Sequence, residues 1–261
     1  MDLGPNLTFE VIDNVGWLTL NRPEARNALT YEMYEGLRSI CSEDPRELDI
    51  KVLVITGAGE KAFAAGTDIA QFRDMTVPQD AIDYESKMDR VFEALETLSI
   101  PTVAAVSGAC TGGGGAIAAS CDLRIATRSM KFGFPIARTL GNCLSAKRLA
   151  RLAHLLGPGR TKDLLFTSRL IEADEALAIG LVSEIVPDHG ALMDRVKDLA
   201  ETLKHQAPIT LACTKEALRR LTEAACAIED EDLIVKAYMS EDFREGMEAF
   251  LAKRKPDWKG V

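Results

Sequence analysis

The sequence predicts a globular α/β protein, and three observations lead to this prediction. Two nearly continuous apolar runs of strand length, 51–56 and Thr102–Val106, indicate strands that helices cover on both faces. Helical periodicity follows each run and is almost continuous from residue 144 onward. A chain of 261 residues is long enough to bury one large core, either alone or with an appendage.

The N-terminal third is expected to alternate strands and helices. Asp13-Asn14 is a hairpin signal between two β-rich runs, and Thr30 is a suitable N-cap for the helix that follows. Pro101 ends a second helix just before the apolar run at 102–106. The elements expected in this third are strands Leu7–Ile12 and Val15–Leu20, a helix from residue 31 to about 41, and a helix over 80–97.

The remainder is expected to be mainly helical. Gly157-Pro158-Gly159 predicts a turn between two helices, and Pro208 predicts the start of another. The other expected elements are a short helix over 117–120, strands over 123–126 and 182–186, and a last helix over 241–253. That last helix has an apolar stripe at helical spacing, made by Phe243, Met247, Phe250 and Leu251.

Charge and hydropathy exclude several classes of protein. The net charge is −9, which argues against nucleic acid as a partner because neutralising phosphates requires a basic face. No apolar run approaches the roughly 20 residues that a membrane-spanning helix needs. The first five residues lack the basic and apolar regions of a secretion signal, so we expect a cytosolic protein.

Cysteine and histidine contents do not indicate a metal site. The cysteines are scattered, form no C-x-x-C pair and lie mostly in apolar contexts, so we expect free buried thiols. They are Cys41, Cys110, Cys121, Cys143, Cys213 and Cys226. The three histidines have no metal-binding spacing, and we therefore expect no bound metal.

Two segments rich in small residues, 57–68 and 108–115, follow the two buried strands. Loops at the carboxyl ends of strands are where α/β proteins place ligands, and small residues let backbone N–H groups approach a substrate oxygen. Two such groups on one carbonyl form an oxyanion hole. Alternatively, the glycines only allow a helix to pack closely on the sheet. P-loop, dinucleotide-binding and nucleophile-elbow patterns are all absent.

Several ordered motifs resemble the crotonase superfamily of enoyl-CoA hydratases and isomerases. The motifs are FAAGTDI at 63–69, IPTVAAVSG at 100–108, the glycines 112–114 with Cys121-Asp122, and REGMEAFLAKR at 244–254. Shorter matches at 22–28 and 176–182 extend the resemblance over nearly the whole chain. The resemblance implies an acyl-CoA thioester as substrate, with no permanently bound cofactor.

The same resemblance implies an architecture and an assembly. It implies a spiral of ββα units over residues 1–195, followed by a helical oligomerisation region over 196–261. We therefore expect a homotrimer or a dimer of trimers.

Carried over position by position, the resemblance also implies a site. The backbone N–H groups of Thr67 and Gly113 would form the oxyanion hole that stabilises the thioester enolate. Residues 64–70 would border the coenzyme A moiety, and basic side chains would meet its phosphates. The candidate substrate-binding and coenzyme-binding residues are Arg26, Lys61, Ala64, Ala65, Asp68, Ile69, Gly112, Ala116, Ile136, Lys253 and Lys255.

The chain departs from the family pattern where proton transfer is expected. Hydratases of this family use two glutamates as general acid and base, and the first of these positions is Ala116 here. The second position is Ile136 or Ala137, because the segment from 132 to 141 is one residue longer than usual. Each missing group would lower the rate by roughly 10²- to 10⁴-fold.

Three hypotheses follow. In the first, replacement groups serve an enzyme, and Arg138 anchors the second carboxylate of a malonyl-type acyl-CoA that is decarboxylated. In the second, the chain binds acyl-CoA without turnover. In the third, a hydratase or isomerase takes an acid or base from elsewhere, for which Asp68, Asp74 and Glu85 are candidates. We expect Asp68 to cap local structure, and Asp74 and Glu85 to be solvated. A nucleophilic Cys143 is disfavoured because no histidine partner is visible.

Overall fold

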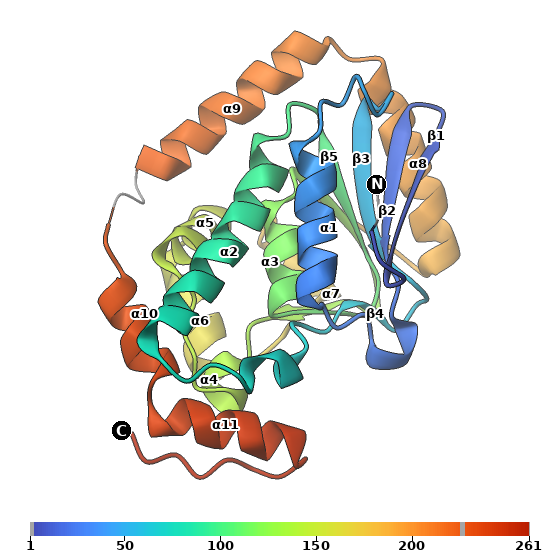
Figure 1. Cartoon of the computed structure of the whole chain (residues 1–261). Helices are drawn as coiled ribbons and strands as arrows, with labels where there is room; N and C mark the ends of the chain where they lie inside the picture. The colour runs from blue at the N-terminus through green and yellow to red at the C-terminus, as the bar shows by residue number, and fades with distance from the viewer. Residues whose placement is uncertain (1–2, 225–227, 261) are drawn as a thin grey trace.

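The computed structural model describes residues 3–224 and 228–260 of the chain (Figure 1). A six-stranded sheet has the strand order β1-β2-β3-β5-β7-β10. Its strands are β1 (Leu7–Ile12), β2 (Val15–Leu20), β3 (Val52–Gly57), β5 (Thr102–Val106), β7 (Leu123–Thr127) and β10 (Glu184–Val186). β1 and β2 form the expected antiparallel hairpin, and the other neighbours are parallel.

A second, four-stranded sheet has the order β4-β6-β8-β9, and the sequence analysis missed all four of its strands. They are β4 (Ala62–Ala64), β6 (Ala109–Thr111), β8 (Lys131–Gly133) and β9 (Ile171–Glu172). Strands of two or three residues are too short to show an alternating pattern. Their pairing matters for the site, because Ala64 of β4 lies opposite Cys110 of β6 and the two small-residue segments therefore run side by side.

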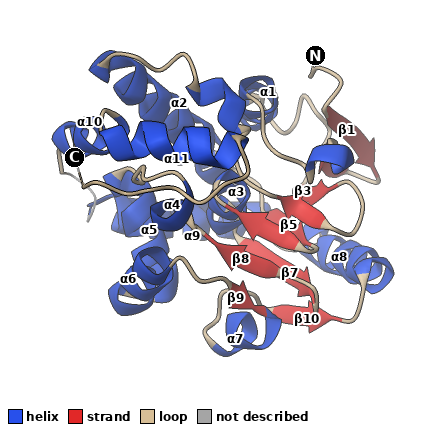
Figure 2. Cartoon of the chain, turned by 90° about the horizontal axis from the view of Figure 1, so that it is seen from below, coloured by secondary structure: helices blue, strands red, loops and turns tan. Residues whose placement is uncertain are grey.

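Helices surround the two sheets (Figure 2). They are α1 (Tyr31–Ser42), α2 (Pro78–Thr97), α3 (Gly113–Ser120), α4 (Ile136–Thr139), α5 (Ala146–Leu156), α6 (Pro158–Thr167), α7 (Ala173–Ala178), α8 (His189–Lys204), α9 (Pro208–Ala224), α10 (Glu231–Tyr238) and α11 (Glu241–Leu251). Two short 3₁₀ helices, η1 (Pro23–Ala25) and η2 (Ile69–Phe72), complete the set. Thr30 caps α1 as predicted, since its side chain accepts a hydrogen bond from the Met33 N–H.

Four helix boundaries differ from the sequence-based expectation, two of them slightly, since α2 begins at Pro78 and α11 ends at Leu251. α3 begins at Gly113, four residues before the predicted start, so the last three glycines of the run form its first turn. α6 begins at Pro158 and leaves only Gly157 between it and α5, because proline is well suited to the first helical position. The glycine run is therefore a helix start and not a loop that precedes one.

The prediction of a sheet covered on both faces is confirmed. Val52 and Val54 pack with Leu192 and Val196 of α8 on one face. The alternate residues of β3, including Leu53, belong to the main core formed with α1, α2 and α3 on the other face. Because successive side chains of a strand point to opposite faces, a strand buried on both sides must be apolar throughout.

The C-terminal helices differ in how they are packed. No residue of α9 is buried, and Figure 1 shows this helix along the outer edge of the molecule, beyond α2 and α5. α10 and α11 return to the core, where Tyr238 and Phe243 are almost fully buried. The apolar stripe predicted on the last helix is only partly correct, since Phe250 is 50% exposed.

A buried ion pair links α2, α5 and α10. Glu85 is 2% exposed and pairs with Arg148, which is 7% exposed, so the expectation of a solvated Glu85 is wrong. The Tyr238 hydroxyl donates a hydrogen bond to the same carboxylate, and the Asn142 side chain donates to the Tyr238 hydroxyl over 3.0 Å. The Glu85 carboxylate of α2 thus connects this helix with α5 and α10, which lie far from it in sequence.

Replacing Arg148 with methionine should destabilise the fold strongly, because Glu85 would be left as a buried charge without its cation. Loss of one partner of a buried pair costs about 3–5 kcal/mol. Urea unfolding of Arg148→Met should show this loss, and the double variant Glu85→Gln with Arg148→Met should recover most of it. Arg46→Met, which removes an exposed pair with Asp44, is the control and should cost under about 1 kcal/mol. Equal losses at both sites would contradict this interpretation.

Candidate active site

The loop that carries Thr67 is held by an extended segment near the N-terminus. The Leu29 N–H donates to the Gly66 carbonyl and the Asp68 N–H donates to the Leu29 carbonyl, both over 2.8 Å. The Ala65 N–H donates to the Arg26 carbonyl over 3.0 Å. Because these bonds occupy residues on either side of Thr67, they fix the direction of its backbone.

The side chain of Asn27 holds this N-terminal segment to residues 58 and 62 through hydrogen bonds. Its side chain is fully buried and donates to the Ala62 carbonyl over 2.8 Å and to the Ala58 carbonyl over 3.1 Å. Its side-chain oxygen accepts from the Arg22 N–H over 3.0 Å. The amide therefore pairs with one buried and two partly buried backbone groups, and leaving such groups unpaired would be costly.

The second loop reaches the site at the start of α3. The Gly112 N–H donates to the Gly133 carbonyl of β8 over 2.9 Å, and Gly112 has φ +53°, a conformation that favours glycine. A side chain on Gly114 would overlap the Ala64 carbonyl of β4. Close packing therefore explains Gly114, as one of the two sequence-based interpretations proposed.

The backbones of Thr67 and Gly113 are neighbours at this point. A Cβ atom added to Gly113 would lie 3.2 Å from the Thr67 hydroxyl oxygen. Within residues 3–224 and 228–260, the backbone N–H group of neither residue donates a hydrogen bond. The Gly113 N–H also lies at the positive end of α3. Two free donors on adjacent segments can together receive one carbonyl oxygen.

Two tyrosines that the sequence analysis did not single out contact this pair. The Thr67 hydroxyl lies 2.8 Å from the Tyr34 hydroxyl and 3.4 Å from the Tyr84 hydroxyl. Burial raises the pKa of both phenols, that of Tyr34 to about 12, so both stay protonated at neutral pH. The sequence does not distinguish these two tyrosines from ordinary core residues of an amphipathic helix.

The candidate coenzyme-binding residues near the Thr67 loop fall into two groups. Arg26, Lys61 and Ala65 are exposed, whereas Ala64 is buried in β4. The backbone bond between Ala65 and Arg26 places these two exposed residues side by side.

Asp68 and Ile69 follow directly along the chain. Asp68 pairs with Arg22 over 3.2 Å and accepts from the Ala70 N–H, so its expected role as a capping residue is confirmed. Ile69 is 9% exposed and begins η2. This segment thus presents one engaged carboxylate and an otherwise apolar surface.

The remaining candidates lie on other elements. Gly112 and Ala116 border the start of α3, and Ala116 is 7% exposed. Ile136 and Arg138 belong to the one-turn helix α4, where Ile136 is half-buried and Arg138 is exposed. Arg138 has no ion pair among the described residues, which argues against a purely structural salt bridge as the reason for this arginine.

The two basic candidates at the C-terminus follow α11. Lys253 and Lys255 are exposed, and α11 itself packs against η2 and α4. The C-terminal helix therefore adjoins the segment after Thr67 as well as the helix that carries Arg138.

The other proposed proton carriers are less suitable in the structure. Asp74 is exposed, as expected, and Glu85 is committed to Arg148 and Tyr238. Burial raises the pKa of the Cys143 thiol to about 11, so a thiolate nucleophile is disfavoured at neutral pH.

Most of the cysteines that the structure describes are buried, as expected, but one is exposed. Cys41, Cys110 and Cys121 are free and buried, but Cys213 is exposed, and Cys226 lies outside the described residues. Residues 3–224 and 228–260 contain no group of three histidine, cysteine or carboxylate side chains placed to hold a metal ion. Among the described helices, none is long and apolar enough to cross a membrane.

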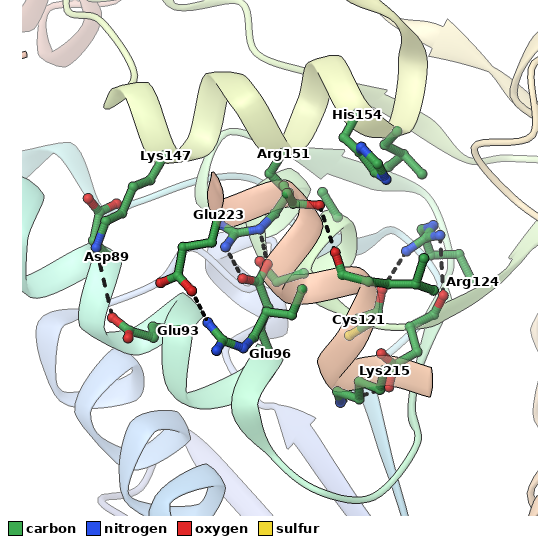
Figure 3. A pocket seen from close by; sticks show the side chains of 17 residues that line it. Asp89, Glu93, Glu96, Cys121, Arg124, Lys147, Arg151, His154, Lys215 and Glu223 are labelled. Atoms are coloured by element: carbon green, nitrogen blue, oxygen red, sulfur yellow. Dashed lines mark hydrogen bonds and ion pairs between the residues drawn. The ribbon is translucent and has the colours of Figure 1, made fainter. Parts of the chain in front are cut away.

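A separate cavity of about 510 Å³ lies between α2, α5 and α9 (Figure 3). It includes neither Thr67 nor Gly113. Four carboxylates on its wall pair with neighbouring cations: Glu93 with Lys147, Glu96 with Arg151, Glu223 with Arg219, and Asp122 with Lys215. Because these cations are already neutralised, the cavity does not resemble a phosphate-binding site.

Comparisons with known proteins identify the family to which this α/β chain belongs. The model of the enoyl-CoA hydratase/isomerase family matches residues 10–261. The chain is 36% identical to the short-chain-enoyl-CoA hydratase of Clostridium acetobutylicum, with 96% of each chain covered. It is 35% identical to the crotonyl-CoA hydratase of Syntrophomonas wolfei, with 97% of each covered.

A solved structure is also similar to this chain over almost its whole length. A methylmalonyl-CoA decarboxylase in complex with 2-nitronate-propionyl-CoA superimposes with a TM-score of 0.88 and 29% identity. The match covers 98% of this chain and 99% of that one. The chain belongs to the enoyl-CoA hydratase/isomerase family, and the predicted crotonase-like fold is confirmed.

Replacing Asn27 with aspartate should destabilise the fold at neutral pH, because a carboxylate would face two carbonyl oxygens to which the amide now donates. We expect a loss of about 3 kcal/mol at pH 7.5. Burial raises the folded-state pKa of the new carboxyl group above its unfolded value, so the charge penalty should shrink as the pH falls through that pKa.

Urea unfolding of Asn27→Asp between pH 8 and pH 4 tests this expectation. Asn14→Asp is a matched control, since Asn14 also has a positive φ but lies at the surface and donates only to the Asp49 carbonyl. Its loss should stay below about 1 kcal/mol. Asn27→Asp with the stability of the control at every pH would refute the role assigned to this amide.

Proposed function

We propose that the chain binds an acyl-CoA thioester and stabilises its enolate between the backbone N–H groups of Thr67 and Gly113. The observation that carries this proposal is the pair of adjacent donors without internal acceptors, held by hydrogen bonds on both sides. Such donors are worth a few kcal/mol each when negative charge develops on the oxygen. Membership of the enoyl-CoA hydratase/isomerase family supports the substrate class.

We propose further that the reaction is the decarboxylation of a β-carboxylated acyl-CoA. The carbon–carbon bond to the carboxylate breaks, its electron pair enters the thioester enolate, CO₂ leaves, and a proton from water then converts the enolate to the saturated acyl-CoA. Bond cleavage needs no side-chain base, which fits Ala116 and Ile136 at the positions expected to carry glutamates. Similarity to a methylmalonyl-CoA decarboxylase supports this choice.

Arg138 is the candidate that would hold the second carboxylate. Its guanidinium is exposed and has no ion pair among the described residues, so it is available to an anionic group. It lies on α4, one or two residues after the position of the second expected glutamate, which is Ile136 or Ala137. A guanidinium can bind a carboxylate through two parallel hydrogen bonds.

Enoyl-CoA hydration is the second candidate function. It is favoured by the names of the relatives in Clostridium acetobutylicum and Syntrophomonas wolfei. Hydration would require a proton carrier elsewhere, because Ala116 and Ile136 have no ionisable group, and Glu85 is a poor candidate because it is paired with Arg148.

A substrate panel separates these functions. We expect the wild type to release CO₂ from malonyl-CoA or methylmalonyl-CoA and to hydrate crotonyl-CoA only slowly. In Arg138→Met the rate of CO₂ release should fall by at least about 10-fold. Introducing the missing carboxylate by Ala116→Glu should raise crotonyl-CoA hydration above the wild-type rate. Efficient hydration by the wild type with no CO₂ release would overturn the decarboxylase proposal. Tight acyl-CoA binding with no turnover of any substrate would instead identify a binding protein.

We propose that α9 contributes to a homotrimer or a dimer of trimers. Ile209, Leu218 and Leu221 of α9 are 76%, 53% and 67% exposed, and Leu233 of α10 is 57% exposed. Large apolar side chains left in water in such number are costly and are typical of an interface. The proposal concerns the region 196–261 as a whole.

Placing a charge among the exposed apolar side chains of α9 should disrupt the proposed assembly. We expect Leu221→Asp to convert an oligomer into smaller species, because a buried unpaired carboxylate is strongly unfavourable at an interface. Light scattering coupled to size-exclusion chromatography gives the mass. Lys162→Asp, at an exposed polar position of α6, is the control and should leave the mass unchanged. A wild-type monomer would refute the proposed assembly.

A further inference from the structure

We infer that Tyr34 is the positioning residue that sets the spacing between the two oxyanion-hole donors, an inference that rests on the proposed function. Its hydroxyl oxygen lies 2.8 Å from the Thr67 hydroxyl oxygen. The same hydroxyl packs against the backbone of Gly113, since a Cβ atom added there would overlap it. One hydroxyl group therefore touches both segments that carry the donors.

Tyr34 is fixed well enough to act as a spacer. It is 1% exposed, and its ring packs edge-on against Phe92 of α2 with the ring centroids 6.3 Å apart. Its backbone N–H donates to the Thr30 carbonyl in the first turn of α1. The hydroxyl is thus held by a capped helix on one side and by an aromatic contact on the other.

The contact with Thr67 orients a residue that has few other restraints on its side chain. The second partner of the Thr67 hydroxyl is the Tyr84 hydroxyl, and that distance is longer, at 3.4 Å. Loss of the Tyr34 hydroxyl would leave Thr67 with this weaker contact and would open space beside Gly113. Because oxyanion-hole catalysis depends on donors that are placed in advance, a small displacement weakens binding of the charged oxygen more than binding of the neutral carbonyl.

Tyr34 acts through Thr67 and Gly113 and does not itself meet the substrate. Its burial leaves no surface for a ligand, and its raised pKa keeps the phenol protonated. The effect of removing its hydroxyl should therefore depend on the charge of the ligand, which a purely structural role would not produce.

Binding of two ligands to the wild type and to Tyr34→Phe tests the inference. Propionyl-CoA has a neutral thioester carbonyl, whereas 2-nitronate-propionyl-CoA carries a negative charge conjugated with it. We expect Tyr34→Phe to weaken binding of the nitronate by about 10- to 100-fold and that of propionyl-CoA by less than about 3-fold. Thr67→Val should show the same selective loss, and Thr67→Ser, which retains the hydroxyl, should restore binding.

Tyr31→Phe is the matched control for the binding experiment. Tyr31 lies on the same helix, but its hydroxyl is 3.4 Å from the Gln71 carbonyl and does not contact Thr67. It should bind both ligands as the wild type does. Equal affinity of wild type and Tyr34→Phe for the nitronate, or equal loss for both ligands, would overturn the inference. A wild type that does not prefer the nitronate would instead contradict the proposed function.

A second measurement tests the spacing without any ligand. Gly113→Ala should destabilise the wild type because the new methyl group meets the Tyr34 hydroxyl. In Tyr34→Phe the nearest atoms would be those of Leu29 and Thr67, at 3.1 and 3.2 Å, so the same change should be better tolerated. Urea unfolding of the four proteins gives the coupling between the two positions. Strictly additive effects would overturn the spacer role even if the proposed function failed.

Discussion

The backbone pairing of residues 26–29 with residues 65–68 is the constraint on which the rest of the candidate site depends. Three hydrogen bonds hold the loop, and the buried amide of Asn27 fixes the segment that supplies them. Since these bonds use the groups on either side of Thr67, its own N–H remains free. The Thr67 N–H is thus left unpaired because the hydrogen bonds of this loop are made by the residues on either side of it.

The second donor depends on the small sheet. Pairing of β4 with β6 brings the two loops together, and the close approach of α3 to β4 requires a glycine at position 114. Gly113 then falls at the first position of α3, where an N–H group has no partner inside the helix. Of the two purposes that the sequence left open for the glycine run, close packing is observed at Gly114, whereas the substrate-binding role of the Gly113 N–H stays a proposal.

The long elements of this fold were predictable, and the short ones were not. Apolar residues at every position of 52–55 indicated a strand buried on both faces, and Thr30 marked the start of α1. By contrast, β4 and β6 have three residues each and owe their conformation to their neighbours. The capping role of Asp68 was also predictable, because it depends on residues adjacent in sequence.

Features that depend on distant partners escaped prediction. Glu85 reads as a charged helix residue exposed to water, and only its position opposite Arg148 explains its burial. The same holds for Tyr34, whose hydroxyl meets a residue 33 positions later. The roles proposed for Thr67 and Gly113 came from family resemblance, because a backbone donor leaves no signal in the identity of the side chain.

The Glu85 carboxylate also bears on the order in which the molecule can assemble. Its hydrogen-bond partner Tyr238 lies 153 positions later in the chain. Contacts between such distant positions form only after a long loop has closed, and until then the carboxylate must remain in water. The interior beneath α2 therefore cannot reach its final packing on the ribosome before almost the entire chain has emerged.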